Sequence, residues 1–348
     1  MNLYQNELYI EDINYITSLD LPWDALKNKT FLISGASGMI GSCLIDALIH
    51  KNINIKILAL ARNEKKAKAR FADLFYSDNF TFIQHDVNDP LDDYGYVDFI
   101  IHAASNTHPR LYATDPIGTI ITNIIGTYNL LNYAVNHGTE RFMFLSSVEI
   151  YGENRENIGK FKESDLGYID CNTLRGGYPE SKRAGEALCK AFMEHNGIKD
   201  IIPRLPRIYG PTMHDSDSKA IAQFIKRGIA RQNIVLKSEG AQLFSYCYIA
   251  DAVTALLTIL LKGTIGEAYN IADPASDITL KDLADIIAQY SKKEVVFAIP
   301  DAIEVAGYSK ATKALLDSRK LKNLGWVPKF DIKSGIRRTI NIMSELLT

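Results

Sequence analysis

The stretch TFLISGASGMIG, residues 30–41, decides the fold. Its apolar half, Thr30–Ser34, predicts a short strand, and its second half predicts a glycine-rich turn that opens a helix running to about His50. The first glycine permits the tight turn, the second lets the backbone approach a pyrophosphate, and the third lets the helix pack close to the strand. Amide groups at the start of such a helix favour an anion. The stretch therefore predicts a dinucleotide-binding loop, with candidate contacts at Gly35, Ser37, Gly38, Met39, Ile40 and Gly41.

Strands and helices alternate along the chain after this loop. We predict further strands at residues 55–61, 80–84, 97–103, 141–146 and 200–204, and helices at residues 62–75, 117–136 and 178–195. Such alternation is typical of a parallel sheet covered by helices on both faces. The predicted fold class is α/β, a Rossmann-type doubly wound parallel sheet with a smaller α/β substrate domain in the C-terminal part.

The pattern changes after Pro206, where strands become shorter and glycine, proline and polar residues become more frequent. We assign residues 29–206 and 243–262 to the dinucleotide-binding domain, because a predicted helix near Asp251–Leu261 returns to the main sheet. Residues 207–242 and 263–348 then form the substrate domain, and residues 1–28 form a leader of mixed polarity.

Composition and charge exclude several classes of partner. The 348 residues are 47% hydrophobic, enough for the core of one large domain or two coupled ones. A net charge of −2 provides no basic field for nucleic acid, and no apolar run reaches the ~18 residues of a membrane span. The start of the chain is acidic and aromatic, unlike a signal peptide, and the four cysteines are scattered. We therefore expect reduced thiols, no metal site and a cytoplasmic protein.

A candidate base lies in the segment YPESK, residues 178–182. Tyr178 and Lys182 are four residues apart, so a helix places both side chains on one face. A tyrosine with an ordinary pKa near ~10 is a poor base at neutral pH. A nearby ammonium group and a positive nicotinamide ring stabilise the phenolate and lower that pKa. Together with the upstream loop, the pair predicts oxidation of a hydroxyl group by a nicotinamide dinucleotide, which both residues also contact.

The segment FLSSVEIYG, residues 144–152, supplies two further candidates at the end of a predicted strand. Ligands of parallel sheets bind beyond the carboxyl ends of the strands. Ser147 can hydrogen-bond to the reacting hydroxyl group and hold it near Tyr178. The sequence leaves two interpretations of Glu149 open: it is either a general base or a solvent-facing carboxylate that follows a strand.

The identity of the dinucleotide stays open between NAD and NADP. An NAD enzyme usually has an acidic residue at the end of the second strand, where this chain has Ala61, Arg62 and Asn63. The guanidinium group of Arg62 either pairs with a 2′-phosphate or is a solvated charge at a helix start. Asp86 and Val87, after the third strand, are expected to flank the adenine.

From residue 29 onward the sequence resembles the extended short-chain dehydrogenases/reductases of the NAD-dependent epimerase/dehydratase family. Within it, the chain is most similar to UDP-glucuronate decarboxylases and next to dTDP-glucose 4,6-dehydratases. The glycine loop and the Tyr/Lys pair carry this resemblance, together with HAAS (102–105), DPI (115–117), GPTMH (210–214) and DSRKL (317–321). The resemblance implies a catalytic role for Glu149, because both groups have a Glu two residues after the catalytic Ser or Thr. It further implies cofactor contacts at Ala103, Ala104, Ser105 and Asn123.

Two positions depart from the family pattern on the substrate side. The family usually has an Arg seven residues before the Asp that matches Asp251, and this chain has Phe244 there. Arg207 stands where the family has a substrate-contacting Asn. Arg207 or Lys219 is therefore the candidate that supplies the positive charge missing at position 244.

These residues predict an enzyme that acts on a nucleotide sugar through a 4-keto intermediate and keeps NAD or NADP tightly bound. A lyase of the decarboxylase or dehydratase type is the first hypothesis. A nucleotide-sugar 4-epimerase is the second, an NADP-dependent reductase the third, and a non-catalytic nucleotide-sensing protein the last. The apolar faces of the helices at residues 117–136 and 178–195 predict a homodimer through a four-helix contact, as in related enzymes.

Overall fold

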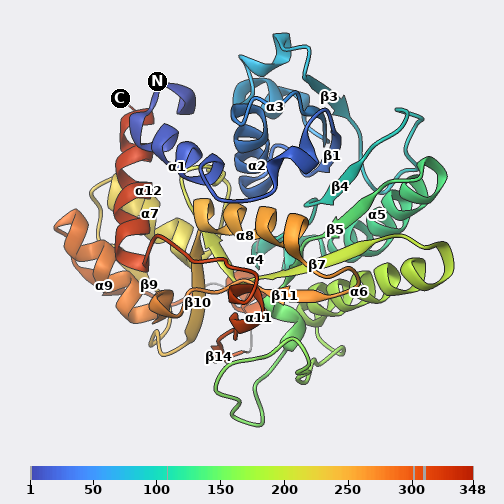
Figure 1. Ribbon diagram of the computed structural model, residues 1–348. Helices are drawn as coiled ribbons and strands as arrows, with labels where there is room; N and C mark the ends of the chain where they lie inside the picture. Colours follow the sequence, from blue (N-terminus) through green and yellow to red (C-terminus); the bar gives the residue numbers. More distant parts are fainter. Residues whose placement is uncertain (1, 108, 301, 309–310, 348) are drawn as a thin grey trace.

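The computed structural model describes residues 2–107, 109–300, 302–308 and 311–347, and its largest element is a parallel sheet (Figure 1). The strand order is β11-β7-β5-β4-β1-β2-β3, and β6 also pairs with β7. β1 lies between β2 and β4, which is the order of a doubly wound dinucleotide-binding sheet. The predicted fold class is therefore confirmed. The strands are β1 Thr30–Ser34, β2 Lys56–Ala61, β3 Phe80–Gln84, β4 Phe99–His102, β5 Arg141–Phe144, β6 Ser146–Ser147, β7 Asp200–Leu205 and β11 Ala268–Asn270.

Helices cover both faces of this sheet, as the alternation predicted. Side chains alternate across a strand, so Phe31 and Ile33 of β1 point to the core that contains α2 and α8. Leu32 points to the opposite core, which contains α5 and α6. Figure 1 shows α5 and α6 lying side by side at one edge of the molecule. The helices are α2 Met39–His50, α5 Pro116–His137, α6 Gly177–Asn196 and α8 Ile249–Lys262.

The predicted helix at residues 62–75 is shorter in the structure. α3 spans Glu64–Arg70, and the 3₁₀ turn η3 follows at Leu74–Tyr76. Asn63 begins the helix, because its side chain accepts a hydrogen bond from the Lys66 amide. Arg62 therefore precedes the helix at the end of β2, beside the crevice where a dinucleotide would lie.

The described part of the predicted leader packs into the core. Tyr9, Ile13 and Ile16 of α1 are at most 2% exposed, and α1 packs against α2 and α8. The carboxylate of Asp46 in α2 accepts hydrogen bonds from Tyr9 and from Arg70 of α3. This segment therefore ties α2 and α3 together below the glycine loop. Its elements are η1 Leu3–Gln5, α1 Glu7–Thr17 and η2 Trp23–Leu26.

The C-terminal part of the chain builds two smaller sheets. One has the order β12-β10-β14 with β8 paired to β10, and the other pairs β13 with β9. The predicted boundaries assign β10 to the dinucleotide-binding domain, but β10 belongs to a small sheet, where it pairs with β8. They assign β11 to the substrate domain, but β11 pairs with β7 and extends the large sheet. The division into two domains stays a prediction. The strands are β8 Arg207–Tyr209, β9 Ile234–Leu236, β10 Leu243–Tyr248, β12 Asp277–Thr279, β13 Val295–Phe297 and β14 Lys313–Ala314. The helices are α7 Ala220–Ile229, α9 Leu280–Ser291, α10 Ala302–Gly307, α11 Arg319–Lys322 and α12 Ile332–Leu346.

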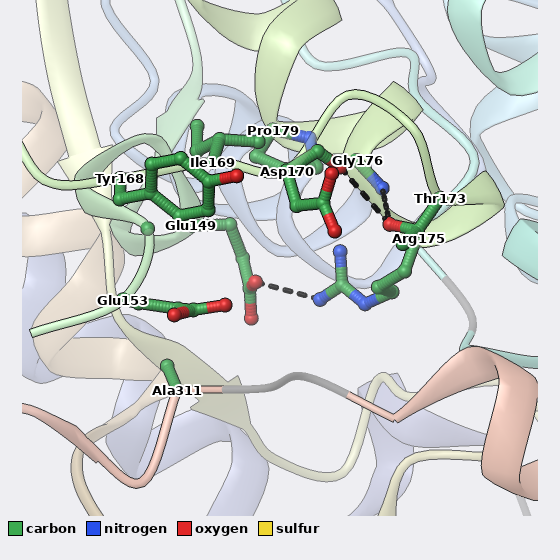
Figure 2. Close-up of a pocket in the computed structure, with 11 residues that line it drawn as sticks. Glu149, Glu153, Tyr168, Ile169, Asp170, Thr173, Arg175, Gly176, Pro179 and Ala311 are labelled. Carbon is green, nitrogen blue, oxygen red and sulfur yellow. Dashed lines mark hydrogen bonds and ion pairs between the residues drawn. The ribbon is translucent and has the colours of Figure 1, made fainter.

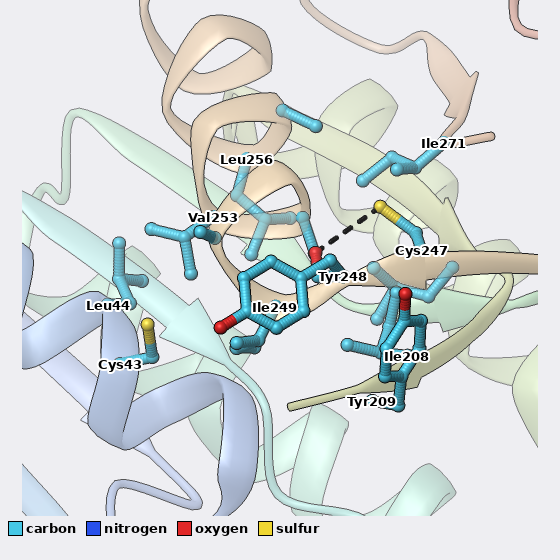
Figure 3. Close-up of a cluster of buried hydrophobic side chains, with 14 of the residues drawn as sticks. Cys43, Leu44, Ile208, Tyr209, Cys247, Tyr248, Ile249, Val253, Leu256 and Ile271 are labelled. Carbon is cyan, nitrogen blue, oxygen red and sulfur yellow. Dashed lines mark hydrogen bonds between the residues drawn. The ribbon is translucent and has the colours of Figure 1, made fainter. Parts of the chain in front are cut away.

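One continuous buried cluster joins the large sheet to the small ones. Figure 3 shows Cys43 of α2 and Val253 of α8 near Tyr248 of β10 and Tyr209 of β8. Tyr248 also donates a hydrogen bond of 2.5 Å to Asp12 of α1. This packing fixes β8 and β10 against the large sheet, so their side chains reach the ends of its strands. All four cysteines are free thiols, and Cys171 alone among them is exposed.

Candidate active site

The glycine loop has the shape that a dinucleotide requires. Gly35 has φ +67°, and a Cβ there would lie 2.7 Å from the backbone carbon of Ala103. A Cβ on Gly41 would lie 2.5 Å from the Gly35 carbonyl oxygen, so the start of α2 can approach β1 only without a side chain. Gly38 is the N-cap, and no side chain of the described residues caps α2 there. Its first-turn amide groups are therefore available for a pyrophosphate, and these residues fit the predicted dinucleotide.

The adenosine end of the predicted site lies beyond β2 and β3. Arg62 Nη1 is 3.8 Å from Asp86 Oδ2, and Arg62 Nη2 donates a hydrogen bond of 3.4 Å to Asn106 Oδ1. The Arg62 side chain is 60% exposed, so it remains accessible to a ligand. Val87 packs against α5 so closely that a Cβ on Gly126 would be 2.7 Å from its Cγ2. The structure thus brings Arg62 and Asp86 together.

The loop after β4, which holds Ala103, Ala104 and Ser105, is tied to the helix of the candidate base. Ser105 donates a hydrogen bond of 2.8 Å to the Asn123 side chain on α5. The amide of Asn123 donates in turn to Ser181 Oγ on α6 at 2.9 Å. Asn123 is fully buried and connects the two elements. Its predicted role as a cofactor contact stays a prediction.

Tyr178, Lys182 and Ser147 meet at the carboxyl end of the sheet. Ser147 hydrogen-bonds to Tyr178, and Lys182 Nζ donates a hydrogen bond of 2.8 Å to the Leu145 carbonyl. Burial lowers the pKa of Lys182 to about 7, although the charge of Glu186 opposes this effect. Burial raises the pKa of Tyr178, while the hydrogen bond with Ser147 acts to lower it. Ser147 and Tyr178 are therefore in contact, and the Lys182 amine is buried beside the Leu145 carbonyl, one helical turn along α6 from Tyr178.

A buried histidine lies behind the lysine. His102 Nδ1 is 2.8 Å from Ser34 Oγ. Burial, and secondarily the charge of Lys182, lowers the pKa of His102 to about 3. His102 is therefore neutral at physiological pH and adds no positive charge next to Lys182.

Glu149 lies between two arginines, which neither of its predicted interpretations anticipated. Arg175 Nη2 is 2.6 Å from Glu149 Oε2, and Arg207 Nη2 is 3.5 Å from Glu149 Oε1. Figure 2 shows the first of these pairs lining a pocket that Glu153 and Asp170 also line. The side chain of Glu149 is only 18% exposed, so a solvent-facing carboxylate is the poorer description.

Arg207 stacks on the aromatic ring that replaces the usual family arginine. Its guanidinium carbon lies 3.3 Å from the centroid of Phe244. β8 and β10 pair in parallel, with Arg207 opposite Tyr246, so Phe244 lies two residues earlier on the adjacent strand. Lys219, the other substrate candidate, instead pairs with Asp217 at 3.1 Å and donates to Thr107 Oγ1 at 3.4 Å. Arg207 is thus the candidate cation that contacts Glu149.

Two residues near the base escaped sequence reasoning. Arg175 lies in the 3₁₀ turn η5 (Leu174–Gly176), three residues before Tyr178, a spacing that could have signalled a shared face. Tyr112 lies on the short helix α4 (Pro109–Thr114), and its ring stacks on Tyr178 with centroids 4.7 Å apart. No local pattern predicts this second contact, because Tyr112 and Tyr178 are 66 positions apart in the sequence (178 minus 112) and only the fold brings their rings together.

The doubly wound sheet and the glycine loop, with Ser147, Tyr178 and Lys182 at the carboxyl end of the sheet, are the features of the extended short-chain dehydrogenase/reductase class. The chain belongs to the NAD dependent epimerase/dehydratase family, which matches residues 31–272, and it is an enzyme of that family.

The chain is similar over most of its length to individual decarboxylases and dehydratases of this family. Over 311 residues the chain is 30% identical to UDP-glucuronic acid decarboxylase 5 of Arabidopsis thaliana, which covers 89% of this chain and 88% of that one. It is 28% identical over 321 residues to dTDP-D-glucose 4,6-dehydratase of Mus musculus, with coverage of 90% and 88%. The solved dTDP-glucose 4,6-dehydratase DesIV of Streptomyces venezuelae, with NAD bound, superposes with a TM-score of 0.80 at 22% identity, covering 90% and 97%. Within the described ranges, no helix has the length and apolar character to cross a membrane.

Replacing Tyr178 with Phe tests the assignment of the base. Tyr178→Phe should lower kcat by at least ~100-fold, because general-base catalysis contributes that much or more. Dinucleotide affinity, measured by fluorescence titration, should stay close to that of the wild type. The matched control is Tyr76→Phe, since Tyr76 is 93% exposed. A Tyr178→Phe enzyme with a tenth or more of the wild-type kcat would show that another group takes the proton.

Proposed function

We propose that this chain is a nucleotide-sugar decarboxylase, a lyase that oxidises C4 of a nucleotide uronate and releases the C5 carboxylate as carbon dioxide. The observation that carries the proposal is the position of Glu149 between Arg175 and Arg207, beside Ser147 and Tyr178. The similarity to UDP-glucuronic acid decarboxylases over most of their length supports this substrate class.

The base and the serine act on the C4 hydroxyl group. Ser147 donates a hydrogen bond that holds this oxygen near Tyr178, and the Tyr178 phenolate takes its proton. When bound, a nicotinamide dinucleotide would supply the acceptor for the C4 hydrogen as hydride and the donor for its return. Lys182, on the same face of α6, stabilises the phenolate form of Tyr178.

The C4 keto group then allows the C5 carboxylate to depart as carbon dioxide, because the keto group can accept the electron pair that is left behind. In a sugar with a ketone at C4 and a carboxylate on C5, the C5–carboxylate bond breaks and its electron pair passes into the C4–C5 enolate. The enolate takes a proton at C5, and hydride return with the Tyr178 proton restores the C4 hydroxyl. The net change is loss of carbon dioxide and gain of one proton.

The two arginines favour a substrate that brings its own negative charge. Arg175 and Arg207 flank Glu149 with their guanidinium groups. Among the described residues, Arg175 Nε and Arg207 Nη1 are buried N–H donors without a hydrogen-bond partner. Such donors cost free energy unless a ligand supplies acceptors. The carboxylate of a uronate would provide them.

The same geometry argues against a dehydratase. A dehydratase needs a base that removes the C5 proton from the keto sugar. Both oxygens of Glu149 face guanidinium groups, which stabilise the ionised carboxylate and make it a weaker proton acceptor. Decarboxylation needs no such base, because carbon dioxide leaves without proton abstraction.

A substrate screen by mass spectrometry tests the proposed reaction. UDP-glucuronate should lose carbon dioxide, while UDP-glucose and dTDP-glucose should be left unchanged. Glu149→Gln should lower kcat for this loss by less than ~100-fold, because Glu149 removes no proton. Tyr178→Phe serves as the inactive control.

Two results would contradict a decarboxylase. Loss of water from a neutral nucleotide hexose, slowed at least ~100-fold in Glu149→Gln, would establish a dehydratase. A change in retention time without a change in mass would establish the epimerase.

We further propose that the dinucleotide is NADP and that Arg62 contacts its 2′-phosphate. Arg62 lies at the end of β2, where an acidic residue would select NAD, and its side chain is largely exposed. A guanidinium group matches the geometry of a phosphate.

Cofactor released by denaturing the purified protein should therefore be NADP. Arg62→Ala should weaken NADP binding about tenfold or more while NAD binding changes little, because only NADP carries the 2′-phosphate. Lys68→Ala removes an exposed charge from the same region and should change neither affinity. Release of NAD alone, with no effect of Arg62→Ala, would exclude the phosphate contact.

We also propose that the protein forms a homodimer through α5 and α6. Ile117, Ile121, Ile125 and Tyr128 recur at intervals of three or four residues on α5 and are 70%, 38%, 41% and 47% exposed. An exposed apolar stripe of this kind marks an interaction surface. A two-fold axis would pair it with its own copy in a four-helix contact. Location in the cytoplasm stays a prediction.

Charges on this stripe should separate the subunits. The double variant Ile121→Glu/Ile125→Glu should have the mass of a monomer in light scattering at micromolar concentration, where the wild type should have that of a dimer. Val327→Glu is the matched control, because Val327 is 72% exposed on a different part of the surface. A wild-type monomer, or a double variant that stays dimeric, would refute the interface.

A further inference from the structure

Among the described residues, Tyr112 is an aromatic side chain that stacks on the candidate base. It lies on α4, in the segment after the β4 loop, and its ring packs on the Tyr178 ring at 4.7 Å with an interplanar angle of 27°. Tyr112 is 6% exposed and Tyr178 is 5% exposed, so neither ring is free to reorient in solvent. The two phenol rings are therefore in direct contact, and the hydroxyl group of Tyr112 belongs to the immediate surroundings of the candidate base.

The hydroxyl groups of Tyr112 and Tyr178 interact through a hydrogen bond that acts to lower the pKa of Tyr178. A phenolate oxygen can only accept hydrogen bonds, so Tyr112 is the donor once Tyr178 has lost its proton. Burial is the largest influence on both groups and raises both pKa values. The Tyr112 hydroxyl is therefore the partner that keeps its proton while Tyr178 gives one up.

Arg175 holds the Tyr112 ring from the substrate side. Its guanidinium carbon lies 4.7 Å from the Tyr112 centroid, and the same guanidinium group pairs with Glu149 at 2.6 Å. A cation at this distance from an aromatic ring is attracted to it. The stack of Arg175, Tyr112 and Tyr178 therefore connects the carboxylate at the sugar end with the phenol that takes the C4 proton.

Several polar and charged groups of the described residues act on Tyr178. Ser147 and Tyr112 hydrogen-bond to it, Arg175 favours its ionised form, and Glu149 opposes ionisation. Lys182 lies one helical turn further along α6. Ser147 has a second task, since it binds the substrate hydroxyl, whereas Tyr112 has none in the proposed reaction.

We propose that Tyr112 is a positioning residue for the base: it donates a hydrogen bond to the Tyr178 phenolate, stabilises that form and fixes its ring plane. This role rests on Tyr178 being the base, as in the proposed function, and is independent of whether carbon dioxide, water or neither leaves. A base works best when its ionised form is populated near the working pH. Tyr112 would extend the range of activity toward lower pH.

The pH dependence of Tyr112→Phe tests this role. The substitution keeps the ring and removes the hydroxyl group. A hydrogen bond to a charged group is strong enough to move the acidic limb of the kcat profile up by about one pH unit. Below the wild-type midpoint, kcat should therefore fall about tenfold, and at the high-pH plateau it should stay within about twofold. Tyr76→Phe, at a tyrosine that is 93% exposed, should leave the profile unchanged.

A titration without turnover separates this role from the proposed function. Tyrosinate absorbance of the dinucleotide-bound protein should contain a low-pH component that disappears in Tyr178→Phe and moves up by about one pH unit in Tyr112→Phe. This result would hold even if the substrate screen excluded decarboxylation. An unchanged titration and limb in Tyr112→Phe would overturn the proposal. So would a kcat reduced equally at every pH, because a merely structural role predicts it. Tyr112→Leu, which also removes the ring, should shift the limb and lower the plateau.

Discussion

The active site depends on one buried ion pair that fixes α6 against the sheet. Arg204 of β7 donates two hydrogen bonds to Glu186 of α6, at 3.0 and 2.7 Å, and Ser146 of β6 donates a third at 2.5 Å. Removing one partner of such a pair leaves a buried charge at a cost of about 3–5 kcal/mol. Lys182 and Tyr178 lie on α6 before Glu186, at intervals of four residues. The pair therefore sets the distance of α6 from the sheet and the rotation that presents Tyr178 to Ser147.

On the substrate side, the two departures from the family pattern are structurally coupled. Losing an arginine at position 244 and gaining one at position 207 look like unrelated changes in the sequence. In the structure the two residues lie on paired strands, and the Phe244 ring supports the guanidinium group of Arg207. A flat cation stacks well on an aromatic face. Arg207 therefore rests on the Phe244 ring while its guanidinium group faces Glu149.

Sequence reasoning succeeded where the information is local. β1 and β3 have the predicted bounds, because each is a short apolar run ended by turn residues. Tyr178 and Lys182 share a face because a helix dictates it. The helix after Arg62 was predicted too long, because the residues after Arg70 form its C-terminal cap and the 3₁₀ turn η3 instead of further α-helical turns. β11 has only three residues in the large sheet. Tyr112 and Phe244 owe their roles to contacts between distant segments, which neither period nor spacing encodes.

The proposed chemistry depends on two neighbouring titratable groups, Glu149 and Tyr178, that have opposite surroundings. Glu149 faces guanidinium groups, which stabilise its charge, and in the proposed function it positions other charges. Tyr178 faces hydroxyl groups, with a buried amine one turn along its helix, and in the proposed function it is the group that takes and returns a proton. Lys182 strengthens this contrast, because burial brings its pKa to about 7 and leaves its charge responsive to what binds beside it. A bound anion would favour the ammonium form and hence the Tyr178 phenolate. Occupancy of the site and activation of the base are then two consequences of the same electrostatic interaction.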